Sequence, residues 1–292
     1  LSLGQPDRQD VVVFKYPRTP QREQSPLNYI KRLIGKPGET IGIWYGDLYV
    51  AEGLHAPPGD PALKFELREP RHMHIDEDVA LLKRDAVAPA GDPRRQFRII
   101  RKTPAQVLTL RRLVHDNAYV ARDLVGKLPP RWAADTGSAW TADHPDRPQV
   151  FQHTPAERPD IGWLRYRHIL RPTGKQSEGR PELITDFLGY NTGKQGDRSG
   201  SPPVNWVGDL ILECQVEVAQ PIGELWLELS RGVDRFQARF HLPSGACTLF
   251  RIRGGAQPLA SAQPTRLGQP GVHQLRLANV DERLTLWVDG DL

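Results

Sequence analysis

Long apolar runs and dense basic blocks are both missing from this sequence. No stretch approaches the roughly 20 apolar residues that a membrane-spanning helix needs. The formal net charge is only +4, and acidic residues are interspersed among the basic ones. Because no basic block alternates with exposed aromatic residues, nucleic-acid binding is not predicted. The nine histidines show no ligand spacing, so we predict neither a metal site nor a cofactor.

Cysteine and methionine are scarce. The only cysteines are Cys214 and Cys247, and without C-x-x-C spacing or neighbouring histidines they predict no zinc site. They are either two small core residues or one disulfide formed in an oxidising compartment. The only methionine is Met73, the first residue is Leu1, and residues 288–292 read as a strand and turn cut short. We therefore interpret the sequence as an internal piece of a longer protein.

Proline and glycine are abundant instead, with 27 and 26 copies. This composition favours short strands and many turns over a helical bundle, and the predicted fold class is mainly β. We expect residues 1–100 to form part of a β-domain and residues 101–192 to be mixed helical and irregular. Residues 193–292 are expected to form an antiparallel β-sandwich.

In the first region, β-branched and aromatic runs predict strands at residues 10–17 and 28–34, each closed by proline or glycine. Residues 40–44 and 48–50 predict a hairpin. In the middle region, apolar residues of 104–124 recur at helical spacing. Residues 126–160, rich in Pro, Asp and Trp, predict irregular surface structure.

From residue 205 onward, apolar and polar residues alternate with a period of two. The pattern recurs about every 10–12 residues, as expected for two packed antiparallel sheets. The apolar face of the first strand is formed by Leu210, Leu212, Cys214, Val216 and Val218. Later strands of the same pattern begin at Leu225, Phe236, Leu275 and Leu284.

Two consecutive segments carry the clearest functional signal. Residues 10–17 read DVVVFKYP, and residues 28–39 read NYIKRLIGKPGE. In this order and at this distance they resemble two successive signature boxes of type I signal peptidases, serine proteases that remove leader peptides. The hairpin ending at Val50 continues the resemblance. Gln9 and Lys36 depart from it, because they stand where the family usually has glycine and an apolar residue.

The resemblance implies that Lys31 is the general base, which takes a proton from a serine hydroxyl. An ammonium group cannot accept a proton, so Lys31 must be neutral, and burial lowers the pKa of a lysine by several units. We therefore expect Lys31 in an apolar environment, with Tyr29 and Leu33 on the same strand face. The resemblance places the serine in a Ser-Met-x-Pro box upstream of Asp10. No residue of this sequence matches that box, so we expect the piece alone to be inactive.

By the same resemblance, Val13, Asn28, Tyr29 and Ile30 line a groove for the extended substrate. Such a groove offers backbone hydrogen bonds along a strand edge and shallow apolar pockets. The implied partners are the signal peptides of exported preproteins, together with a membrane surface reached through missing segments. The implied location is the outer, periplasmic face of the inner membrane.

The middle and C-terminal regions look similar to a long insertion in signal peptidase-like proteins of planctomycete-type bacteria. The closing strands resemble those of concanavalin/laminin-G-like sandwiches. An alternative is a degenerate peptidase whose sandwich binds a glycan or a protein, with Trp226 and Trp287 as candidate stacking platforms. A third alternative is a sandwich that serves only as a spacer.

Overall fold

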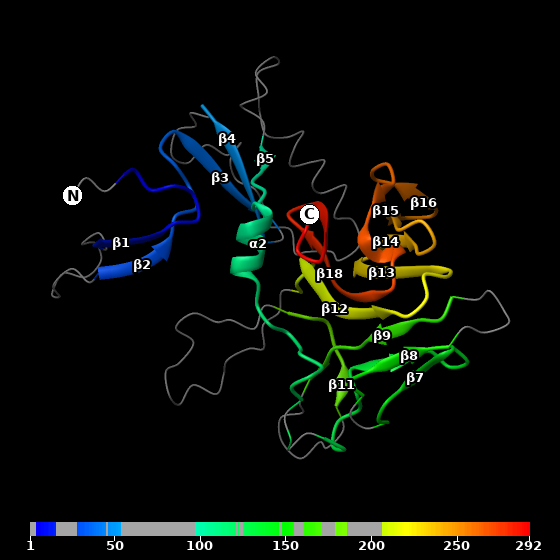
Figure 1. The fold of residues 1–292 in the computed structure, drawn as a ribbon. Helices are drawn as coiled ribbons and strands as arrows, with labels where there is room; N and C mark the ends of the chain where they lie inside the picture. Colours follow the sequence, from blue (N-terminus) through cyan, green and yellow to red (C-terminus); the bar gives the residue numbers. More distant parts are fainter. Residues whose placement is uncertain are drawn as a thin grey trace. The chain divides into compact units, whose positions relative to one another are not determined.

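The structure is a computed structural model in which two compact units are distinguished. It describes residues 4–15, 28–44, 46–53, 97–120, 122, 125–145, 148–154, 161–170, 179–185 and 206–292. The first unit comprises Leu1–Thr109 together with Gly208–Leu292, and the second comprises Leu110–Val207. Figure 1 labels the elements of both units, which are described separately below. Every sheet formed by these residues is antiparallel, which confirms the mainly β fold class.

The strands predicted in the first 52 residues are present. β1 (Val11–Lys15) pairs with β2 (Asn28–Arg32) in a two-stranded sheet. β3 (Glu39–Trp44), β4 (Asp47–Glu52) and β5 (Arg98–Ile99) form a three-stranded sheet with β4 in the middle. The β3–β4 connection contains Gly46 at a φ of 86°, a left-handed conformation that glycine adopts without strain. A small core forms where Tyr49 and Ala51, both fully buried, meet Phe97.

The helix that forms is much shorter than the apolar pattern of residues 104–124 that predicted it. α2 spans Pro104–Leu110 and begins with a capping box. The Gln106 amide donates to Thr103 Oγ1, and the Thr103 amide donates to Gln106 Oε1; proline at the first helical position suits this start. Val107 is buried, whereas Leu113 is 73% exposed. The expectation of a helix to residue 124 was wrong, because burial reaches only the first part of the apolar stripe and packing supplies most of a helix's stability.

Residues 208–292, called here the two-sheet unit, form two antiparallel sheets. In one sheet the strand order is β12 (Leu210–Val218), β18 (Gly271–Val280), β19 (Arg283–Val288). The other is built in the order β13 (Glu224–Arg231), β14 (Asp234–His241), β15 (Ala246–Ile252), β16 (Ala256–Pro258). β17 (Gln263–Pro264) also pairs with β15, and the 3₁₀ helix η4 (Arg266–Gly268) follows it.

The two sheets share one hydrophobic core, which contains the apolar residues predicted from the period-two pattern. The buried members are Leu227, Leu229, Ala238, Phe240, Cys247, Leu267, Leu275, Leu277 and Val288. Cys214 packs against this core, and both cysteines are free thiols, so the disulfide alternative was wrong. Burial raises the pKa of Cys214 to about 11 and that of Cys247 to about 12. Both thiols therefore act as small core residues.

The described residues of the second unit form three pairs of short strands. β6 (Trp132–Ala134) pairs with β9 (Leu164–Tyr166), and β7 (Trp140–Ala142) pairs with β8 (Phe151–His153). β10 (Ile169–Leu170) pairs with β11 (Arg180–Pro181). The prediction of irregular structure for residues 126–160 missed β6, β7 and β8, because strands of three residues are too short to show a period-two pattern.

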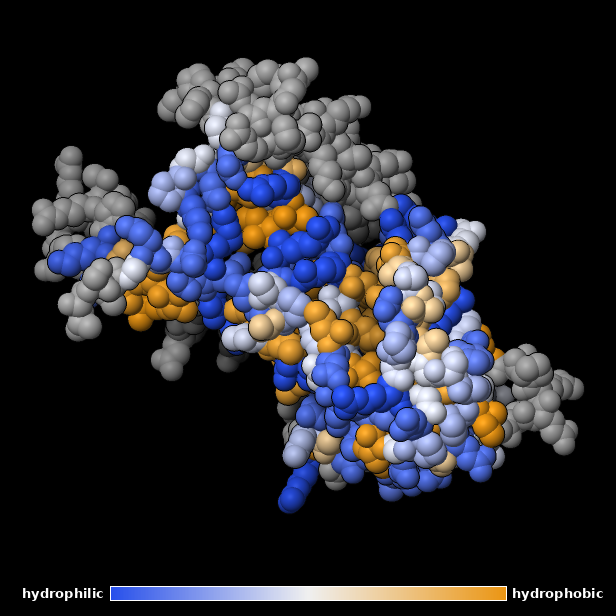
Figure 2. All heavy atoms as spheres, turned by 45° about the horizontal axis from the view of Figure 1, so that its top comes forward, coloured by the Kyte–Doolittle hydropathy of each residue, from blue (hydrophilic) through white to orange (hydrophobic). Residues whose placement is uncertain are grey.

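Two surface properties complete the description. Within the part of the chain that the structure describes, no helix combines the length and apolarity needed to cross a bilayer. Figure 2 shows apolar residues in several separate groups among polar ones, one of them in the region of β1 and β2. Val11, Val13 and Ile30 are exposed on these two strands, by 57%, 64% and 60%. This pair of strands therefore presents an aliphatic surface to its surroundings.

The shared core predicts a large loss of stability when one of its leucines is truncated. Leu277 is completely buried, whereas Leu259 is 47% exposed. We expect Leu277→Ala to lower the free energy of unfolding by about 2–5 kcal/mol, because it removes buried methylene groups and leaves a cavity. The control Leu259→Ala should change it by no more than about 0.5 kcal/mol. Denaturant titration measures both, and equal effects of the two variants would contradict the described core.

Candidate functional site

Lys31, the predicted general base, lies near the end of β2, opposite Val12 of β1. Alternation along the strands places Tyr29 and Phe14 on the same face of the sheet as Lys31. Tyr29 is opposite Phe14 in the register, and their rings stack with centroids 6.2 Å apart. One face of the β1–β2 sheet therefore carries the amine beside two aromatic rings.

The predicted substrate-binding residues divide between the two faces of this sheet. Val13 lies directly opposite Ile30 in the register. Alternation places Asn28 on the face of Val13 and Ile30, and Tyr29 on the face of Lys31. Three of the four residues are thus brought together, and they are exposed. Tyr29 is separated from them by the backbone of the sheet.

Lys31 is exposed in this structure. Leu33, its expected apolar neighbour, is half-buried. The expectation that an apolar environment encloses Lys31 is not met by the described residues. The reason is that, among the described residues, β1 and β2 form a sheet of two strands, and no second layer of these residues covers its side chains.

The start of β1 is held by contacts to the segment that follows β2. The Gln9 amide donates to the Leu33 carbonyl over 2.8 Å, and the Leu33 amide donates to the Asp10 carbonyl over 2.9 Å. Arg8 forms an ion pair with Glu39 at 2.6 Å, in which both side chains are largely buried. The Arg8 guanidinium, which donates a hydrogen bond to Glu39, holds the pKa of that carboxyl below its usual value. These contacts connect the Lys31 sheet to β3.

Gln9 has a φ of 78°, which explains why the resembling family usually has glycine at this position. Left-handed backbone places Cβ too close to the following carbonyl oxygen, and glycine has no Cβ. The family's usual glycine at this position therefore corresponds to a left-handed backbone conformation. Gln9 carries a Cβ, so the same conformation is strained in this protein.

A buried group of charged residues was missed by the sequence analysis. Carboxylate oxygens of Asp47, Asp209 and Asp281 lie within 4.8 Å of one another. Asp47 is the first residue of β4, Asp209 directly precedes β12, and Asp281 follows β18. No sequence pattern links three aspartates that are so far apart along the chain.

Two cationic side chains lie beside these aspartates. Arg231 Nη2 is 3.4 Å from Asp47 Oδ2, and Arg231 Nη1 is 3.7 Å from Asp209 Oδ1. Lys102 Nζ is 2.5 Å from Asp281 Oδ1. Because the carboxylates already have arginine and lysine partners, we assign no metal ion to this group.

Burial has the largest effect on the pKa of Asp47. Burial raises its pKa to about 7, the negative charge of nearby Asp209 contributes in the same direction, and Arg231 opposes the shift only in part. Burial also raises the pKa of Asp209. Asp47 therefore changes its protonation state around neutral pH.

The two candidate glycan-stacking platforms differ in how far the structure covers them. Trp287 is 5% exposed and packs with Val107 and Ala278, so its assignment as a platform was wrong. Trp226 is half-buried and its ring is covered by the Arg239 guanidinium, 4.0 Å from the ring centroid. Cation–π contact of this kind occupies one face of the Trp226 ring.

Comparisons with known proteins agree with the motif resemblance. Residues 2–91 match the family model described as signal peptidase, peptidase S26. The N-terminal part of this chain is similar to signal peptidases. Signal peptidase I of Pseudomonas aeruginosa is 46% identical over 41 residues, which are 14% of this chain and 13% of that protein. The match thus spans a small part of that relative's length. No solved structure matches the chain.

The buried carboxyl of Asp47 predicts a pH dependence of stability. Its folded pKa, about 7, lies above its unfolded value of 3.8. Between these values the folded state holds a proton that the unfolded state has lost, so this group's contribution falls as pH rises, by up to about 1.4 kcal/mol per pH unit. Asp47→Asn should flatten the stability profile between pH 4 and 7, measured by denaturant titration at each pH. An identical slope in both proteins would contradict the burial of this carboxyl.

The left-handed backbone of Gln9 predicts opposite effects of two substitutions. Gln9→Gly should leave stability unchanged or raise it by up to about 1 kcal/mol, because relief of strain exceeds the extra entropy of the unfolded chain. Gln9→Val should lower stability by about 1–2 kcal/mol, because a β-branched residue is disfavoured at positive φ. Chemical denaturation compares the two variants directly. Equal stabilities would show that residue 9 does not adopt this conformation.

Proposed function

We propose that this polypeptide is a signal peptidase I-like serine endopeptidase that cleaves leader peptides from exported proteins. The observation that carries the proposal is the similarity of residues 2–91 to the signal peptidase family. The two signature-like segments form paired strands, with Lys31 on the second of them. The protein would need no metal or organic cofactor, because a Ser/Lys pair suffices for this reaction.

In the proposed mechanism, Lys31 accepts the proton of a serine hydroxyl while the serine oxygen attacks the carbonyl carbon of the leader peptide bond. The serine would come from an upstream segment of the protein. The proton then passes from Lys31 to the leaving amine, and water hydrolyses the acyl-enzyme.

The amine must be neutral for this step, and in the described structure it is exposed. The proposal therefore requires that another segment or the bound substrate cover the Lys31 face of the sheet. The apolar neighbours Val12, Phe14 and Tyr29 lie on that face. Covering it would remove the amine from water, and burial disfavours the charged form of such a group.

The substrate would bind as an extended strand along β1 and β2. Among the described residues this sheet has two strands, and its outer backbone edges suit the addition of a peptide strand. Val13, Asn28 and Ile30 offer an aliphatic and amide surface for small side chains, and Tyr29 would contribute from the face of Lys31. The bond after a leader peptide becomes accessible on the outer side of the membrane during export, so we propose that the protein acts at the periplasmic face of the inner membrane.

A non-catalytic protein that binds a partner through its two-sheet unit is the second candidate. The exposure of Lys31 favours it, because the described residues do not bury the amine as the catalytic proposal requires. Its ligand would not stack on Trp287, which is buried. The two candidates differ in whether the function depends on the Lys31 amine.

Substitution of Lys31 separates these candidates. In the full-length polypeptide, assayed on a preprotein substrate in membrane vesicles, Lys31→Ala should lower kcat/KM at least about 1,000-fold. Lys31→Arg should be as inactive, because a guanidinium does not lose its proton in proteins. Lys36→Ala, which removes an exposed surface ion pair with Asp7, is the control and should keep activity. Undiminished cleavage by Lys31→Ala would refute the assignment, and no cleavage by the parent protein would favour the non-catalytic candidate.

A further inference from the structure

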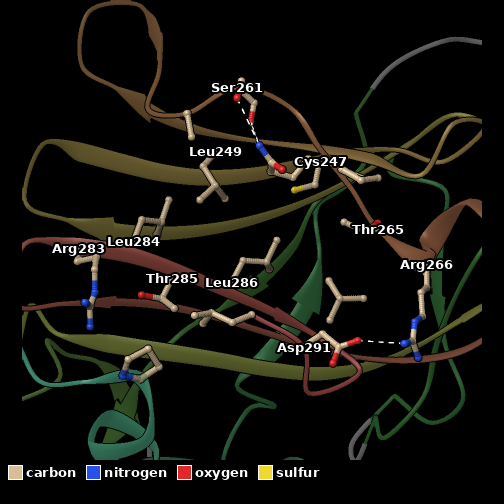
Figure 3. Close-up of a pocket in the computed structure, with 16 residues that line it drawn as sticks. Cys247, Leu249, Ser261, Thr265, Arg266, Arg283, Leu284, Thr285, Leu286 and Asp291 are labelled. Atoms are coloured by element: carbon tan, nitrogen blue, oxygen red, sulfur yellow. Dashed lines mark hydrogen bonds and ion pairs between the residues drawn. The ribbon is translucent and has the colours of Figure 1, made fainter.

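A cleft of about 630 Å³ opens in the two-sheet unit beside β19. Figure 3 shows Cys247 and Leu249 on one side of it and Leu284 and Leu286 on the other. Arg283 lies at one end, and the ion pair between Arg266 and Asp291 lies at the other. The walls thus consist of side chains from the inner faces of the two sheets. This cleft is a part of the hydrophobic core that is open to solvent.

The cleft exists because the two sheets differ in width. β19 is the edge strand of a three-stranded sheet, and it faces a sheet of five strands. Beyond β19, the segment from Ala260 to Thr265 lines the cleft together with β15. The described residues therefore leave the inner face of the wider sheet uncovered along the outer edge of β19.

A tight turn directs the backbone along this edge. Asp289 and Gly290 have φ values of 55° and 88°, the left-handed pair typical of the two-residue turn that joins hairpin strands. The Val288 amide donates to the Asp291 carbonyl over 2.9 Å, and the Asp291 amide donates to the Val288 carbonyl over 3.0 Å. This mutual pair is the first step of an antiparallel ladder on the outer side of β19.

The free edge also determines what kind of molecule the cleft suits. Alternate residues of a strand direct their amides and carbonyls to the same side, so Leu286 and Leu284 present theirs outward, as Val288 does. Within residues 206–292, all of which the structure describes, β19 pairs with no strand other than β18. An apolar small molecule in the cleft would desolvate these backbone groups without bonding to them, at about 1–3 kcal/mol each. A β-strand satisfies them.

We propose that the cleft is filled by a further β-strand of the same polypeptide, which continues from the Asp289–Gly290 turn antiparallel to β19. In the register set by the Val288–Asp291 pair, the residues opposite Leu286 and Leu284 face the cleft. They are therefore apolar and alternate with polar residues. This strand closes the core over Cys247 and adds a fourth strand to the narrower sheet.

The test compares residues 1–292 with the full-length polypeptide by hydrogen exchange at single residues. The proposal predicts that the amides of Leu284 and Leu286 exchange at least 10-fold more slowly in the longer polypeptide. It also predicts that alkylation of the Cys247 thiol slows at least 10-fold, because this side chain lines the cleft. Cys214, which does not line it, is the internal control and should react at the same rate in both proteins.

A turn variant provides a second measurement. In the longer polypeptide, Gly290→Val should abolish the protection of Leu284 and Leu286, because valine is disfavoured at a φ of 88°. Gly223→Val is the matched control, since Gly223 has a φ of 76° and a Cβ there would meet no atom within 4 Å; it should leave the protection unchanged. Equal exchange of the two leucine amides in both proteins would overturn the proposal. So would polar residues at both cleft-facing positions of the full-length sequence.

Discussion

The turn between β18 and β19 depends on side chains from the N-terminal half of its unit. Asp281 and Glu282 both have positive φ, 51° and 55°, and for residues other than glycine this backbone costs roughly 1–2 kcal/mol each. The Lys102 amide and ammonium both donate to the Asp281 carboxylate, and the Tyr49 hydroxyl donates to Glu282. These bonds offset the strain. Contacts from Tyr49 and Lys102 thus stabilise the described form of this turn.

A series of direct contacts connects the β1–β2 sheet, which carries Lys31, to the two-sheet unit. The β1–β2 sheet is held to β3 by the Arg8–Glu39 ion pair, and β3 pairs with β4 along its whole length. β4 begins at Asp47, which contacts Arg231 of β13. The series is a structural connection, and it explains why Leu1–Thr109 and Gly208–Leu292 form one compact unit. The predicted division at residues 100 and 192 stays a prediction about domains.

The sequence allowed the prediction of features that depend on local chemistry. Alternation identified the core-facing residues of β12, β13 and β14, because each strand has one buried face. It did not identify β15, where Cys247 and Leu249 alternate with Thr248 and Phe250, since an aromatic residue on the outer face weakens the pattern. The two signature-like segments identified Lys31 and the strand that carries it. They did not reveal its exposure, because exposure depends on what covers the sheet.

Contacts between segments far apart in the chain could not be predicted from the sequence, for a different reason. The Asp47, Asp209 and Asp281 side chains meet only because three separate chain segments pack together. Trp287 was expected to be exposed on an outer face, but Val107 of α2 covers it.

The pairing of Asp281 with Lys102 tests most directly whether the N-terminal segment and the two-sheet unit fold as one. In a double-mutant cycle of Lys102→Ala and Asp281→Asn, measured by denaturant unfolding, the account predicts a coupling energy of about 1–3 kcal/mol. Additivity within about 0.3–0.5 kcal/mol would contradict it.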